Sequence, residues 1–148
     1  MLEQSKMGGL VTPQELRTRA EEKALAEAKK DFEAQRKAEE QKRELHELFM
    51  TREVKPEAMD RLMAAVTRAA EDGKSELMIV RFPSEYLTDG GRAVNNFEHD
   101  WPKTLEGFAK RAYDFYEQNL RTHGYKLWLQ ILEYPGGKPG DVGMFLSW

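Results

Sequence analysis

The sequence contains no cysteine among its 148 residues. This absence excludes disulfide bonds, thiolate metal ligands and cysteine nucleophiles, and it favours a reducing compartment. Long apolar runs are also missing, because the densest one in the second half spans only residues 77–80, and the first residues form no stretch of signal-peptide length. We therefore expect a cytoplasmic protein that has no membrane partner.

An excess of charge of one sign is missing too. The 23 basic and 26 acidic residues give a formal net charge of -3, and the two signs alternate along the chain. Proteins that bind the phosphate backbone of nucleic acids depend on a surplus of positive charge. The charge balance therefore disfavours nucleic-acid binding.

The sequence also lacks a recognisable catalytic or metal-binding motif. His46, His99 and His123 are far apart, and none has a second histidine or a carboxylate at the spacing of a helical zinc site. No pair of carboxylates stands out as an acid–base pair. We expect no metal, no cofactor and no catalytic residue, so that an enzyme is the less favoured interpretation.

The first third of the chain has the features of one long charged helix. Residues 14–50 contain neither glycine nor proline and are rich in strong helix formers. Thr12 and Glu15 have the spacing of a capping box, and Pro13 suits the first helical position. The sequence predicts a flexible N-terminus at residues 1–12 and a helix at residues 13–50.

Large apolar residues are sparse in this helix, so it cannot be buried on all sides. A narrow stripe of small and apolar side chains is present, which permits weak coiled-coil association or docking of a protein partner. The stripe consists of Leu16, Ala20, Ala24, Ala28 and Phe32.

Proline marks the start of a second region. Pro56 pushes the residue before it away from helical geometry, so residues 51–55 are predicted to be a linker and residues 56–148 a separate α/β domain that folds without the long helix. Periodicity and turn residues predict helices at 56–72 and 102–123, strands at 76–82, 125–134 and 141–148, and a loop at 84–100. The segment 135–140 is typical of a hairpin turn.

This order of elements predicts an α+β fold. Two helices are expected on one face of a three-stranded mixed sheet, because a strand–helix–strand crossover returns to the same sheet. Alternation in the strand 125–134 places Leu127, Leu129 and Ile131 on one face and Trp128, Gln130 and Leu132 on the other. Trp128 and Leu132 are therefore predicted to lie at an interface, and a homodimer is the expected oligomer.

The loop before the second helix is the strongest candidate for a small-molecule site. It combines two glycines with turn-forming and hydrogen-bonding residues and one guanidinium, a composition that can hold a carboxylate or a phosphate. The candidate ligands are Asp89, Arg92, Asn95, Asn96 and His99.

These observations leave three functions open. The first choice is a noncatalytic assembly or interaction protein, homo-oligomeric, which uses the helix and the α/β domain. The alternative is a domain or enzyme that binds a small anionic metabolite at the loop of residues 89–101. Nucleic-acid binding is third.

Overall fold

The computed structural model describes residues 8–148, and the chain divides between Leu45 and His46 into two compact units. The expectation of a flexible N-terminus falls largely on residues 1–7, outside the described part. Helix α2 (Pro13–Thr51) agrees with the predicted helix to within one residue at its end. Its capping box is formed, since Glu15 N donates to Thr12 Oγ1 at 3.2 Å and Thr12 N donates to Glu15 Oε2 at 3.4 Å.

No residue of α2 is fully buried, as its charged sequence requires. Leu25 is 71% exposed and Phe32 is 67% exposed. Helix α2 continues across the division of the two units, so its last six residues belong to the second unit, His46–Trp148.

The second unit contains a three-stranded antiparallel sheet in the order β1-β3-β2. Its strands are β1 (Glu76–Pro83), β2 (Lys126–Ile131) and β3 (Asp141–Ser147). The predicted α+β class and the β2–β3 hairpin are confirmed, but the prediction of a mixed sheet is wrong. The reason is that β3 lies between β1 and β2 and runs antiparallel to both, so the two parallel strands never pair.

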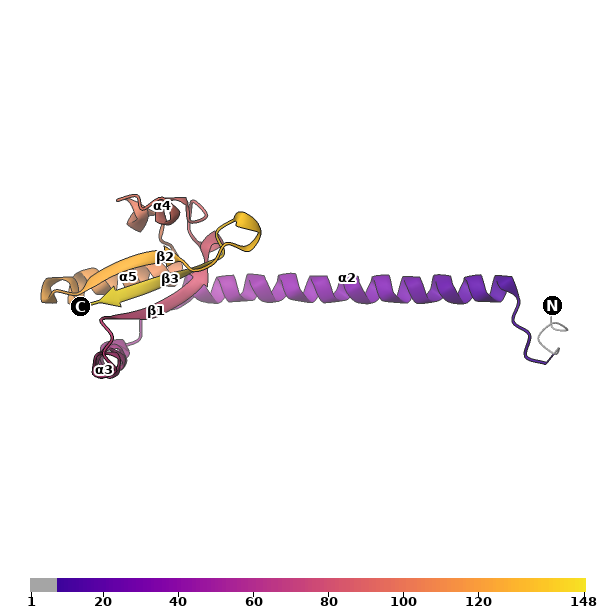
Figure 1. The fold of residues 1–148 in the computed structure, drawn as a ribbon, viewed down its shortest axis with the longest axis horizontal. Coiled ribbons are helices and arrows are strands. Elements are labelled where there is room, and N and C mark those ends of the chain that lie inside the picture. Colours follow the sequence, from indigo (N-terminus) through magenta and orange to yellow (C-terminus); the bar gives the residue numbers. More distant parts are fainter. Residues whose placement is uncertain (1–7) are drawn as a thin grey trace. The chain divides into compact units, whose positions relative to one another are not determined.

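Two helices cover one face of this sheet, as predicted. Helices α3 (Ala58–Glu71) and α5 (Gly107–Asn119) share a core cluster with Leu146 of β3. Val142, Met144 and Leu146 alternate along β3 and are fully buried, because the central strand points these side chains at the helices. In Figure 1, α5 lies behind the sheet, and α3 lies beside β1.

The predicted helix at 102–123 is divided into three parts. The 3-10 helix η2 (Trp101–Thr104) comes first, then α5, then the 3-10 helix η3 (Arg121–His123). The helix cannot run through Gly107, which has φ +58°, a left-handed conformation that glycine adopts at little cost.

The predicted loop at 84–100 also contains short helices. They are η1 (Ser84–Tyr86) and α4 (Arg92–Asn95), and a further 3-10 helix, η4 (Pro135–Gly137), lies in the hairpin connection. Helix α4 contacts β2 and contributes the buried Val94 to the core.

The last turn of α2 is built into the second unit. The Phe49 ring lies 5.2 Å from that of Phe82 and 4.9 Å from that of Tyr86, measured between centroids. Arg111 Nη1 donates to the carbonyl oxygens of Met50 at 2.8 Å and Arg52 at 3.1 Å, which satisfies the open end of the helix. The folded unit thus includes residues that precede the expected boundary at Pro56.

Candidate functional site

A cluster of apolar side chains lies on the face of the sheet opposite the helices. Phe145 of β3 is in register with Met78 of β1 on one side and with Trp128 of β2 on the other. The Trp128 and Phe145 rings stack, with centroids 4.4 Å apart and planes 9° from parallel. We call Met78, Trp128, Leu132 and Phe145 the open-face cluster.

Gly143 shows that this cluster is continuous. A Cβ atom placed on Gly143 would lie 2.8 Å from the Phe145 ring, 3.0 Å from Leu132 Cδ2 and 3.0 Å from Met78 Sδ. Side chains from β1, from β3 itself and from the residue that follows β2 therefore close over the glycine. Within residues 8–148 none of the four belongs to either buried core cluster, and Met78 is 41% exposed.

Charged residues border the open-face cluster. Arg81 Nε donates to Asp141 Oδ2 at 2.9 Å, and Arg81 Nη2 lies 3.8 Å from Glu133 Oε1. This hydrogen bond to Asp141 is the main reason that the pKa of Arg81 is raised further above its usual value. Lys126 lies at the other end of the sheet, in register with Ser147. An apolar centre with a charged border is the usual composition of a protein–protein interface.

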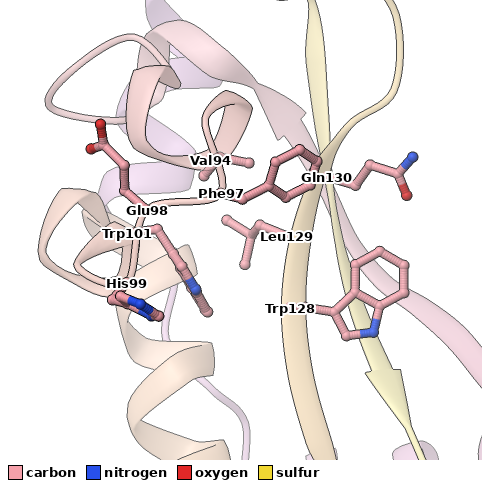
Figure 2. A pocket seen from close by; sticks show the side chains of 8 residues that line it. All are labelled: Val94, Phe97, Glu98, His99, Trp101, Trp128, Leu129 and Gln130. Carbon is pink, nitrogen blue, oxygen red and sulfur yellow. The ribbon is translucent and has the colours of Figure 1, made fainter.

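A second candidate site is a cavity of about 440 Å³ at the outer edge of β2. Figure 2 shows that the segment after α4 forms one side of it and β2 forms the other. The lining residues are Val94, Phe97, Glu98, His99, Trp101, Trp128, Leu129 and Gln130. We call this cavity the β2-edge pocket.

The segment after α4 is held in place by local contacts. Glu98 N donates to Ala93 O at 2.9 Å, and this hydrogen bond closes the C-terminal end of α4. Phe97 is the first residue after the C-cap, Asn96. Phe97 has φ +54° and is 88% exposed.

Trp101 is supported from behind by Tyr113 of α5, which meets it edge-on at a centroid distance of 5.7 Å. Burial, followed by the hydrogen bond to Glu117, raises the pKa of the Tyr113 hydroxyl. The Trp101 ring is thereby fixed against the body of the domain.

The five loop residues named from the sequence do not form one site. His99 lines the β2-edge pocket, but the other four are absent from its lining. The Asp89 carboxylate accepts hydrogen bonds from Gly91 N and Ala93 N, both at 2.9 Å, and Asn95 Oδ1 accepts one from the Tyr134 hydroxyl at 2.7 Å. Arg92 and Asn96 are exposed. Asp89 and Asn95 thus have structural partners of their own.

We expect Asp89→Ala to destabilise the second unit by about 1–2 kcal/mol, because two amide donors at the start of α4 lose their acceptor. Chemical denaturation of the full chain measures the change. Asp100→Ala is the matched control, since Asp100 precedes η2 without a side-chain capping bond, and it should change stability by less than about 0.5 kcal/mol. Equal effects of the two substitutions would contradict this role of Asp89.

Several residues of these surfaces were not singled out from the sequence. The sequence singled out Trp128 but not its stacking partner Phe145, because the register of the hairpin decides which side chains are in contact. Met78 was missed for the same reason, since β1 pairs with β3 rather than with β2. Phe97 has no distinguishing pattern in the sequence, and only its backbone conformation sets it apart.

Comparisons with protein-family models, with characterised proteins and with solved structures gave no significant match to this chain. In the part of the chain that the structure describes, no helix is both long and apolar enough to cross a membrane. Function must therefore be inferred from the geometry of the chain itself.

Proposed function

We propose that this protein is a noncatalytic assembly protein whose α/β domain forms a homodimer through the open-face cluster. The observation that carries the proposal is the row Met78, Phe145 and Trp128, which crosses all three strands on the face that lacks helices. A contiguous apolar patch of this kind is costly to leave in water and is typical of a site of association.

A second copy of the chain is the occupant that the charges favour. In a two-fold dimer the same surface faces itself, so a border of one sign would repel its copy. The border of the open-face cluster carries charges of both signs. Its basic residues are Arg81 and Lys126, and its acidic residues are Glu133 and Asp141. Rotation about a two-fold axis can bring acidic residues of one copy near basic residues of the other.

The long helix α2 offers a separate surface for a protein partner. Leu25 and Phe32 are exposed on it, and the apolar stripe noted in the sequence is too narrow to form a heptad seam. In the proposed function the α/β domain supplies the self-association, and α2 is free to contact another protein.

We expect Trp128→Glu and Phe145→Glu each to convert the dimer to a monomer, because each places a charge within the apolar row. Light scattering of the full chain across a dilution series measures the mass. Thr122→Glu is the control, because Thr122 is exposed on η3 and lies outside the open-face cluster. A wild-type chain that remains strictly monomeric at high micromolar concentration would rule out the homodimer.

A further inference from the structure

The β2-edge pocket brings together aromatic side chains from three places in the chain. Phe97 follows α4, Trp101 begins η2, and Trp128 lies in β2. In Figure 2 Trp101 and Leu129 lie on one side of β2, with Val94 and Phe97 near the top of the cavity, whereas the Trp128 ring points to the other side of the strand. A volume of about 440 Å³ falls in the range of sites for small molecules.

The charge of this lining favours a cation over an anion. Glu98 is the acidic residue of the lining, and neither lysine nor arginine contributes to it. Figure 2 shows the Glu98 carboxylate turned away from Trp128, so it stands at the rim rather than in the centre. A cation entering the cavity meets the negative faces of aromatic rings, whereas a phosphate or a carboxylate meets neither lysine nor arginine there.

The conformation of Phe97 points to a role in binding rather than in folding. Among residues 8–148, Phe97 is the one residue other than glycine that has a positive φ. It stands directly after a helix, where glycine is the usual residue with this conformation. The side chain nevertheless remains 88% exposed, so it gains little from burial in the folded domain. A strained backbone that holds an aromatic ring in solvent at the mouth of a cavity is a feature that ligand binding explains and packing does not.

We propose that the β2-edge pocket binds an alkylammonium group, with Phe97 and Trp101 as the aromatic contacts. This inference is independent of the proposed homodimer, because Phe97 and Trp101 are not part of the open-face cluster.

The small number of hydrogen-bond acceptors selects this class of cation. Besides Glu98 at the rim, the lining side chains that can accept a strong hydrogen bond are Gln130 and His99. A guanidinium carries five N–H donors, and those left without acceptors after desolvation would weaken binding. A trimethylammonium group carries no N–H donor and presents methyl groups to the rings, which is how aromatic cages recognise quaternary ammonium ligands.

Choline is a suitable probe, and the three tryptophan indole N–H signals in a 1H–15N NMR spectrum of the full chain are the readout. Choline should shift the Trp101 signal in a saturable manner and leave the signal of Trp148, which lies outside the lining, unchanged. The neutral isostere 3,3-dimethylbutan-1-ol has the same shape, and we expect it to bind about three- to thirtyfold more weakly.

Variants at Phe97 separate a binding role from a structural one. Phe97→Leu should weaken choline binding by about three- to thirtyfold, and Phe97→Tyr should retain it. Phe97→Gly should abolish the contribution of the ring to choline binding. It should leave the melting temperature unchanged or higher, because glycine adopts the left-handed backbone conformation without strain. Lys103→Ala is the control, since Lys103 is exposed on η2 and is not in the lining.

Four results would overturn the proposal. The first three are the absence of any saturable shift of the Trp101 signal with choline, equal binding of the neutral isostere, and tighter binding of arginine methyl ester than of choline. A fourth is a Phe97→Gly variant that melts at a lower temperature and binds choline as the wild type does, which would assign the ring to packing. The mass measured by light scattering does not enter any of these outcomes, so the dimer and the pocket fail or succeed separately.

Discussion

Replacing Gly107 by alanine is expected to destabilise the α/β unit by about 3 kcal/mol or more. Two effects combine at this position. The residue has φ +58°, which costs a residue with a Cβ atom about 1 kcal/mol. The new Cβ would also lie 2.8 Å from both Cα and Sδ of Met50 and 3.0 Å from the Phe49 carbonyl oxygen. The Met50 thioether can move aside, but the backbone of the last turn of α2 cannot move without losing its packing.

Gly124 provides the matched control for this prediction. It also has a left-handed backbone, with φ +91°, but nothing lies within 4 Å of the position of its Cβ. Gly124→Ala should therefore show only the conformational cost, about 1 kcal/mol. Denaturant unfolding of the two full-length variants measures the difference, and equal destabilisation would mean that α2 does not approach α5 as closely as the structure indicates.

The secondary structure of this protein could be predicted mainly where a residue pattern had one physical interpretation. The capping box of Thr12 and Glu15 and the alternation around Leu129 gave the right elements because the side-chain period alone determines them. Sheet topology was harder, since strand pairing depends on distant residues. The prediction of a mixed sheet was wrong because the sequence does not show that β3 lies between β1 and β2.

The candidate sites show the same limit. Trp128 could be placed on the open face from its position in an alternating strand, but its contact with Phe145 required the register of the hairpin. Asp89 was recognised as a polar residue in a glycine-containing loop, yet two amide donors already occupy its carboxylate. Local sequence gives the chemistry of a side chain, and tertiary structure decides whether that chemistry is still available.

The end of α2 was the least predictable part of the domain. Pro56 suggested a boundary near residue 55, because proline disfavours helix in the residue before it. The rings of Phe49, Phe82 and Tyr86 nevertheless pack together, and Arg111 holds the carbonyl end of the helix. The sequence of a polar helix with an aromatic residue near its end does not predict which of its turns will pack into a core.

We therefore expect the stability of the domain to depend on the last turns of α2. A chain that begins at Lys42 retains these turns and should unfold cooperatively. A chain that begins at Lys55 lacks Phe49 and the carbonyl partners of Arg111, and it leaves Gly107 beside an empty space. The loss should be about 3 kcal/mol or more, a large share of the roughly 5–15 kcal/mol that stabilises a typical domain.

Two neighbouring residues test the same idea in the full-length chain. Phe49→Ala should cost about 2–4 kcal/mol, because it removes a ring that contacts Phe82 and Tyr86. Leu48→Ala is the matched control, since Leu48 precedes Phe49 in the same helix but is 65% exposed, and it should change stability by less than about 0.5 kcal/mol. Thermal and denaturant unfolding of the two variants and the two shortened chains give the comparison. If the chain beginning at Lys55 unfolds with the same midpoint and cooperativity as the one beginning at Lys42, the domain starts at Pro56, as the proline alone suggested, and the contacts of Phe49 contribute nothing to its stability.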